Sequence, residues 1–346
     1  MNFSKLNVAI LGAGLMGHWH AYYANKLGAK VVAVIDPQNT FAQDLARRYK
    51  KTLFFSNLQT ALNHVHIDVL HICTPKSSHF ELSLLALNSG VHVIVEKPLT
   101  DDVSETQILI EKAKTHNLKL LPVHQFPFQR SALKAIEALN CLDGICRIEF
   151  TICSAGGEGS TKEQLSAVIA DILPHPLSLL KLFVPSISLE NIEWLVNYPV
   201  AGELSVITDI NGVSVSIYIS QNSRPTRCGS TIYCRKGRIH LNLFHDYAVI
   251  EKGRHSRLQK LIQPLKFNLF SLISSSTNLI YRAMTGEKAY PGLRSLISQY
   301  YQTIIFDKLP PISNAEILDV AIARERIMAS YMAVNIDNGK VINKST

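Results

Sequence analysis

The chain has 346 residues, of which 47% are hydrophobic and 18% are charged, and its formal net charge is +8. This length exceeds the ~250–300 residues at which a single core stops growing, so we expect a globular protein with two domains. No run of ~20 uninterrupted apolar residues is present, which excludes a membrane-spanning segment. The positive charge indicates an anionic ligand or surface without choosing among nucleotide, nucleic acid and lipid.

The beginning of the chain and its cysteines indicate a compartment. Residues 1–7 carry one Lys and no apolar run, so no secretory signal peptide is expected. The six cysteines form no CxxC pair, and a chain of this size does not need disulfides. We therefore expect reduced thiols in a cytoplasmic protein.

A glycine-rich turn follows the first predicted strand, residues 7–11, and reads Gly12-Ala13-Gly14-Leu15-Met16-Gly17. This GxGxxG pattern directly follows a strand and opens a helix of about residues 18–27, the context typical of dinucleotide binding. Gly12 permits the tight turn, Gly14 lets the backbone approach a pyrophosphate, and Gly17 allows close packing of the helix on the strand. The helix N-terminus supplies N–H donors for the phosphates.

An acidic residue ends the second predicted strand, residues 30–35. Asp36 stands about 20 positions past the glycines, where a carboxylate accepts hydrogen bonds from the adenosine ribose. Because a carboxylate also repels a 2′-phosphate, Asp36 favours NAD over NADP. Arg47 and Arg48 could host a phosphate, but we expect them on the outer face of a helix over residues 41–49.

Two later strands also end in polar residues. The strand at 69–73 ends in Thr74-Pro75, with His79 opening a helix, and the strand at 91–95 ends in Glu96-Lys97-Pro98. In an open parallel sheet, ligands bind in the crevice outside the carboxyl ends of the strands, so Lys97 is expected to point into it. The strand–helix repeats predict right-handed crossovers and a doubly wound parallel Rossmann sheet over residues 1–123.

The pattern changes after residue 123. A segment at 144–153 alternates like a half-buried strand, and we expect further strands at 192–197, 203–209, 213–220, 230–235 and 238–243. These elements predict an α+β domain over residues 124–346, with an open, mostly antiparallel sheet and helices on one face. A helical excursion is expected at about 252–300, and a C-terminal helix at 314–334.

Taken together, these features resemble the Gfo/Idh/MocA family of oxidoreductases, the relatives of glucose–fructose oxidoreductase and inositol dehydrogenase. The order and spacing of the family are kept by GAGLMG at 12–17, Asp36, Cys73-Thr74-Pro75 with His79, Glu96-Lys97-Pro98, and Asp171 with His175. The resemblance implies a Rossmann domain, a sheet-based second domain that often mediates homo-oligomers (a dimer or a tetramer), and a tightly held nicotinamide cofactor.

Residue by residue, the resemblance implies catalytic roles for Lys97, Asp171 and His175. The residues expected to contact the cofactor are Gly12, Gly14, Leu15, Met16, Gly17, Asp36, Thr74, Pro75, His79, Glu96 and Lys97. No metal ligands are expected.

Two departures from the family concern the substrate side. Where the family often has an Asn-Arg-Arg-like run, this chain has His124-Gln125-Phe126-Pro127, so the family's contacts do not transfer there. His124 and Gln125 are nevertheless candidate substrate residues by position, beside Asp171 and His175. Pro174 and Pro176 flank the His, and a following proline biases His175 away from the helical region, which weakens the prediction that the i,i+4 pair shares a helix face.

The expected reaction moves a hydride between nicotinamide and a secondary alcohol or ketone of a sugar, with a nucleotide sugar first. His175 would accept the hydroxyl proton, because an ordinary imidazole pKa of about 6.5 suits that task. Asp171 would orient it or bind a neighbouring hydroxyl, and Lys97 would stabilise charge on the reacting oxygen. The alternatives are a dehydrogenase of a cyclic polyol or dihydrodiol, and a non-catalytic NAD-binding sensor. Nucleic-acid binding lacks any module beyond the charge.

Residues 252–288 are the part least explained by the resemblance. Six basic residues and His255 precede the first acid, Glu287, and apolar residues recur at helical spacing beyond Pro264. One interpretation is a helical excursion whose apolar face packs on the sheet domain or on a partner subunit. The other is that residues 254–282 bring the enzyme to an anionic membrane surface or to a nucleotide-sugar diphosphate.

Overall fold

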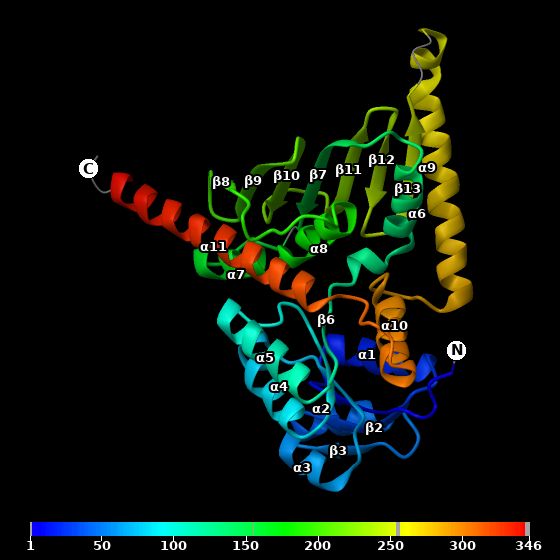
Figure 1. The fold of residues 1–346 in the computed structure, drawn as a ribbon, viewed down its shortest axis with the longest axis vertical. Helices are drawn as coiled ribbons and strands as arrows, with labels where there is room; N and C mark the ends of the chain where they lie inside the picture. Colours follow the sequence, from blue (N-terminus) through cyan, green and yellow to red (C-terminus); the bar gives the residue numbers. More distant parts are fainter. Residues whose placement is uncertain (1, 155, 254–256, 343–346) are drawn as a thin grey trace. The chain divides into compact units, whose positions relative to one another are not determined.

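A computed structural model describes residues 2–154, 156–253 and 257–342, and it divides the chain into two compact units (Figure 1). Residues 1–124 and 293–321 form the first unit, and residues 125–292 and 322–346 form the second. The change of unit after His124 falls one residue beyond the boundary expected from the sequence. The return of 293–321 to the first unit was not expected.

The first unit is built on a parallel sheet in the order β3-β2-β1-β4-β5-β6. The chain leaves β1 toward one edge and resumes at β4 toward the other, so the topological switch point lies between β1 and β4. Strand β4 is completely buried and β1 is buried from Val8 onward, as both faces of such a sheet are covered. The described strands are β1 Asn7–Leu11, β2 Lys30–Ile35, β3 Leu53–Phe55, β4 Val69–Ile72, β5 His92–Val95 and β6 Leu120–Pro122.

Helices connect these strands and cover the sheet. Helix α1 packs against β1, β2 and β4, and α4 packs against β4 and β5 and contacts α5. The described helices of this part are α1 Leu15–Lys26, α2 Asn39–Ala46, α3 Leu58–His64, α4 His79–Asn88 and α5 Val103–Thr115, with a short 3₁₀ turn η1 at Lys76–Ser78.

Helix α10, Leu293–Phe306, explains why a late segment joins the first unit. It contacts α1, and the hydroxyl of Tyr300 reaches the carbonyl oxygens of Val93 (2.8 Å) and Lys119 (2.7 Å) at the start of β5 and β6. Tyr300 and Tyr301 are fully buried. Burying two large aromatic rings, worth roughly 1.5–3 kcal/mol each, fixes this helix against a sheet far away in sequence. The terminal helix α11, Asn314–Ile342, begins in the first unit and continues in the second.

The second unit holds a sheet in the order β13-β12-β11-β7-β10-β9-β8. It is mostly antiparallel, as expected, but β7 and β10 run parallel. Strand β13 was not expected, because the sequence analysis ended the last hairpin at residue 243. The described strands are β7 Ile145–Cys153, β8 Leu195–Asn197, β9 Glu203–Ile210, β10 Val213–Ser220, β11 Arg227–Cys234, β12 Gly237–Asn242 and β13 Tyr247–Lys252.

The helices of this unit include α7 and α8, which carry predicted site residues. The described helices are α6 Arg130–Leu139, α7 Lys162–Ile172, α8 Pro174–Phe183 and α9 Arg257–Thr285, and a 3₁₀ turn η2 at Phe126–Phe128 precedes them. Among the described residues, the continuous span Lys162–Phe183 is long and apolar enough to pass for a membrane span, but 67% of its most apolar window is buried within the structure. That burial is typical of core helices.

Helix α9 lies along β13 at the edge of the sheet (Figure 1). It contains Pro264 in its interior, whereas the sequence analysis started the helical pattern after this residue. Its polar side packs against the sheet domain, and its leucines and isoleucines face away from it. The interpretation in which the apolar face packs on the sheet domain is therefore wrong. Residues 254–256 of the expected membrane segment lie outside the described residues.

Candidate functional site

The glycine loop between β1 and α1 has the geometry of a phosphate cradle. Gly12 adopts φ +94°, and a Cβ there would lie 2.6 Å from the carbonyl oxygen of Cys73. A Cβ at Gly17 would lie 1.9 Å from the carbonyl oxygen of Gly12, so both positions require glycine. At Gly14, by contrast, no described atom lies within 4 Å of an added Cβ. The open space therefore lies at the start of α1, where N–H donors and the helix dipole favour an anion.

Asp36 joins this loop to the end of β2. Its Oδ2 accepts a hydrogen bond from the backbone N–H of Ala13 at 2.8 Å, and its Oδ1 accepts one from Gln38 at 2.8 Å. A carboxylate has about four acceptor sites, so these two bonds leave capacity for ribose hydroxyls. A tight glycine turn, an open helix N-terminus and a carboxylate beside them fit a dinucleotide, with the pyrophosphate at Gly14 and the ribose at Asp36.

His79 holds the two neighbouring strand ends together. Its buried ring places Nδ1 2.8 Å from the carbonyl oxygen of Pro98 and Nε2 2.9 Å from that of Thr74. The Ser78 hydroxyl donates to the Thr74 hydroxyl at 2.8 Å. The ring thus bridges the loops after β4 and β5. The expected contact of His79 with the cofactor stays a prediction, and the observed bonds give this histidine a positioning role for the loop that carries Lys97.

Behind Lys97 lies a buried polar chain that the sequence analysis missed. His20 Nε2 is 3.1 Å from Glu96 Oε1, His20 Nδ1 is 2.8 Å from His71 Nδ1, and His71 Nε2 is 2.8 Å from the Tyr301 hydroxyl. Donation from Tyr301 through His71 and His20 to Glu96 satisfies every ring nitrogen with both imidazoles neutral. Burial lowers the pKa of His71 well below its usual value, and the neighbouring His20 lowers it further, which agrees with a neutral ring.

This chain fixes the Glu96 carboxylate next to the predicted catalytic lysine. Glu96 is buried, and its Oε2 accepts a hydrogen bond from the backbone N–H of Lys97 at 3.2 Å. The signal in the sequence was a histidine in the middle of the apolar strand β4, because a buried polar group needs a partner. The sequence analysis did not connect His20 to Glu96.

His124 lies close enough to Lys97 to respond to its charge. Burial and then the Lys97 ammonium lower the pKa of His124 to about 4, against a smaller opposing effect of Glu96. His124 is therefore a neutral imidazole at pH 7. His124 and Gln125 are both buried, with 4% and 7% of their surface exposed, and their expected substrate contacts stay predictions.

The predicted acid–base pair lies in the second unit. Asp171 is in the last turn of α7, and His175 is the second residue of α8, with Leu173 in helical torsions between the two helices. The i,i+4 spacing therefore places both half-buried side chains on one side of a continuous helical path, although Pro176 disfavours this conformation at His175. Lys97 lies in the first unit.

Phe126 is a further residue that the sequence analysis did not select. Its ring stacks on the imidazole of His175, with centroids 4.1 Å apart and planes 12° from parallel. The contact fixes the orientation of the imidazole, as a proton-transferring group requires. The only signal was its position in the run that departs from the family pattern.

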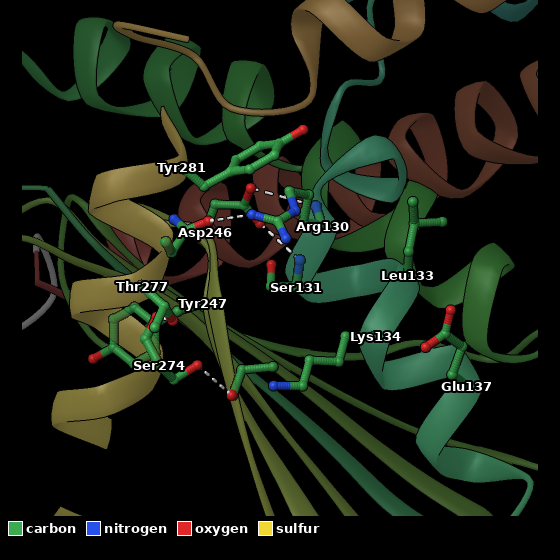
Figure 2. Close-up of a pocket in the computed structure, with 12 residues that line it drawn as sticks. Arg130, Ser131, Leu133, Lys134, Glu137, Asp246, Tyr247, Ser274, Thr277 and Tyr281 are labelled. Atoms are coloured by element: carbon green, nitrogen blue, oxygen red, sulfur yellow. Dashed lines mark hydrogen bonds between the residues drawn. The ribbon is translucent and has the colours of Figure 1, made fainter. Parts of the chain in front are cut away.

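A cavity of about 460 Å³ lies elsewhere in the second unit, between α6, α9 and β13 (Figure 2). The buried Asp246 lines its base, and the Asp246 carboxylate accepts a hydrogen bond from the backbone N–H of Ser131 at 2.8 Å. The Arg130 guanidinium closes one side by stacking on Tyr281, 3.6 Å from its ring centroid. Residues of the predicted site do not line this cavity, so it is separate from the candidate site within the described part of the chain.

Comparison with known proteins agrees with the geometry of the first unit. Residues 6–124 match the sequence profile described as "Oxidoreductase family, NAD-binding Rossmann fold" of the Gfo/Idh/MocA group. This part of the chain therefore resembles the NAD-binding domain of the Gfo/Idh/MocA oxidoreductases.

Two curated relatives each match a part of the chain. D-glucoside 3-dehydrogenase of Escherichia coli is 40% identical over 100 residues, which are 28% of this chain and 28% of that protein. scyllo-Inositol 2-dehydrogenase (NAD(+)) of Bacillus subtilis is 33% identical over 112 residues, 32% of this chain and 33% of that protein. The matched segments thus span about a third of the relatives' own length.

A solved structure resembles nearly the whole chain. UDP-N-acetylglucosamine 3-dehydrogenase of Acidithiobacillus ferrooxidans superposes with a TM-score of 0.71 at 16% identity, covering 94% of this chain and 97% of that one. At this identity the likeness establishes the fold, including the second, mostly antiparallel sheet.

The open space at Gly14 predicts a separation of stability from cofactor binding. Gly14→Ala should leave the free energy of unfolding of the NAD-free protein within about 0.5 kcal/mol of the native value, because its Cβ meets no described atom. Affinity for NAD, measured by calorimetry, should fall at least about tenfold, because the Cβ fills the pyrophosphate cradle. Gly17→Ala is the contrasting variant and should lose stability itself. Native NAD affinity in Gly14→Ala would contradict this placement.

Buried His124 predicts that stability falls in acid. In the unfolded chain, His124 binds a proton below about pH 6.5, whereas in the folded protein it stays neutral down to about pH 4. The contribution of His124 to stability is therefore fully present above about pH 6.5 and is lost as the pH falls from about 6.5 to about 4. The loss attributable to His124 amounts to roughly 3 kcal/mol. His124→Gln should flatten the dependence in urea unfolding at about pH 7 and about pH 4.5. His116→Gln, at an exposed histidine that directly follows α5, is the control, and equal slopes in all three proteins would refute the assignment.

Proposed function

We propose that this protein is an NAD-dependent oxidoreductase that acts on a secondary alcohol or ketone of a carbohydrate. The observation that carries the proposal is the convergence at one sheet edge: an open phosphate cradle, the Asp36 carboxylate and Lys97, braced by Glu96 and His79. A protein that only binds the nucleotide needs the phosphate cradle and the carboxylate, but it does not need a lysine supported by a buried polar chain. The bound nicotinamide would supply the hydride chemistry.

The protein's own residues would manage the proton. Lys97 would hydrogen-bond the reacting oxygen and stabilise negative charge on it. His175, oriented by Phe126, would accept the hydroxyl proton, and Asp171 would orient His175 or bind an adjacent hydroxyl. The fixed imidazole plane favours this assignment, because general-base catalysis requires the acceptor nitrogen to be held at hydrogen-bond distance from the proton.

The substrate we favour is a sugar, and among sugars a nucleotide sugar. Curated relatives carry the names of glucoside and nucleotide-sugar dehydrogenases, and the net charge of +8 suits an anionic diphosphate. A cyclic polyol or a dihydrodiol is the second candidate, supported by the named inositol dehydrogenase. A non-catalytic NAD sensor is the third, and it would bind NAD without turnover.

A substrate panel separates these candidates. Purified protein with NAD is mixed with UDP-N-acetylglucosamine, a simple D-glucoside, scyllo-inositol and a dihydrodiol, and NADH absorbance is followed. We expect reduction with a sugar-based alcohol. Tight NAD binding would instead favour the sensor if no alcohol of these classes reduces NAD and no corresponding ketone oxidises NADH.

Two further proposals concern the setting of the enzyme. A cytoplasmic location is supported by the six cysteines, which are free thiols in the structure. A homo-oligomer is supported by apolar side chains on the open face of the second sheet, among them Leu195 and Ile207.

Asp36 should make NAD the preferred cofactor. Fluorescence titration should give a lower dissociation constant for NAD than for NADP, because the carboxylate repels a 2′-phosphate. Asp36→Ala should narrow the gap, since the repulsive group is removed. Tighter binding of NADP by the native protein would overturn this assignment.

Lys97→Ala and His175→Ala should each lower turnover on the true substrate by about 10²–10⁴-fold while NAD binding survives. If the two side chains act on one proton, the double variant should lose less than the product of the single effects. Lys30→Ala and His116→Ala, at exposed positions of the first unit, are the matched controls and should retain native turnover. Near-native activity of either site variant would remove that residue from the mechanism.

A further inference from the structure

Helix α9 is fixed to the second unit by its polar side. The Ser274 hydroxyl donates to the Ala248 carbonyl oxygen at 2.9 Å, and the Asn278 amide donates to that of His245 at 2.7 Å. Arg130 of α6 adds a contact to Asn278 at 3.4 Å and lies under Tyr281 (Figure 2). These bonds determine which side of the helix faces the domain.

The opposite side of α9 is apolar and lies open. Over residues 261–284, about 35 Å of helix, its large side chains are about half to more than three quarters exposed. A helix on a globular surface normally buries its apolar stripe and exposes its polar one, and here the arrangement is inverted. The exposed set is Leu261 (77%), Leu265 (72%), Leu269 (55%), Leu272 (63%), Ile273 (49%), Leu279 (68%), Ile280 (59%) and Met284 (83%). We call it the α9 ridge. A contiguous apolar surface of this kind marks an interaction site.

Charge indicates what covers the α9 ridge. The sequence from Lys252 to Gly286 contains six Lys and Arg residues and no Asp or Glu. Lys266 is exposed within this stretch. A stretch that carries an apolar ridge, basic residues and no acids in its own sequence matches a surface that offers negative charge above an apolar interior.

We propose that the α9 ridge docks on the surface of an anionic phospholipid bilayer. The ridge would enter the boundary between headgroups and acyl chains, and the basic residues would lie among the phosphates. The helix would lie in the plane of the membrane without crossing it. This role is independent of the proposed hydride transfer, and its tests do not require the substrate.

A second copy of this chain is the rival occupant, and two observations count against it. Leucines recur every seven residues at Leu258, Leu265, Leu272 and Leu279, as in a coiled coil. Ile273 and Ile280, however, extend the apolar arc beyond the narrow stripe that a two-stranded coil buries. Pairing two copies would also bring together two basic segments without acids to neutralise them.

The test is flotation of the full-length, NAD-bound protein with lipid vesicles. One set contains equal parts of phosphatidylserine and phosphatidylcholine, and the other contains phosphatidylcholine alone. Recovery should be at least about tenfold higher on the anionic vesicles and should fall with added salt, because screening weakens attraction between basic residues and lipid.

Variants locate the contact. Leu265→Ser with Leu272→Ser should abolish recovery, and Lys266→Glu should lower the preference for anionic vesicles. Leu53→Ser with Leu309→Ser, at leucines that are 51% and 90% exposed outside α9, is the matched control and should float like the native protein. Circular dichroism and the unfolding midpoint of every variant report that the fold is intact.

Two outcomes would overturn the proposal. One is equal or absent recovery on both vesicle types. The other is a native protein that does not float and that forms an oligomer without lipid, measured by light scattering, which the α9 variants dissociate. That result would assign the ridge to contact with a second copy.

Discussion

All strands of the first sheet run parallel and end at one edge, and the candidate site depends on this constraint. Burying both faces leaves the backbone at the carboxyl ends as the place where polar residues can meet a ligand. The glycine loop, Asp36, Thr74 and Lys97 each follow a different strand, yet the sheet order places their strands side by side. The candidate cofactor site therefore combines residues that lie between Gly12 and Lys97 in the sequence.

Positioning of Lys97 requires more than the strand that carries it. The chain of Tyr301, His71, His20 and Glu96 is buried, so each missing partner would leave a polar group without compensation for lost water. This makes the loop after β5 rigid, because Glu96 has few alternative orientations. It also ties the site to α10, which supplies Tyr301 from a segment nearly two hundred residues later.

The two sides of α9 show how an interaction surface can be kept at the expense of ordinary packing. Polar contacts through Ser274 and Asn278 contribute about 1 kcal/mol each, less than burying the leucines would. A helix held in this way retains its apolar side for another surface.

The sequence by itself determined the Rossmann sheet, its cofactor loop and the residues that follow the strands, because these depend on local patterns: apolar runs, glycine conformations and strand ends. Strand bounds in the first unit agree within one residue. It did not determine that 293–321 completes the first unit, that β13 extends the second sheet, or that His20 reaches Glu96. Those contacts join segments far apart in the chain, and pairing across such distances leaves no periodic signal.

Orientation of α9 belongs to the same class. Helical spacing predicted its two faces, but which of them meets the domain depends on partners supplied by β13 and α6, and only the tertiary structure brings these together. The stacking of Phe126 on His175 was likewise decided by the fold, since neither residue type signals the other across almost fifty positions. The sequence determines which residue types follow each strand, whereas long-range packing determines which side chains contact them.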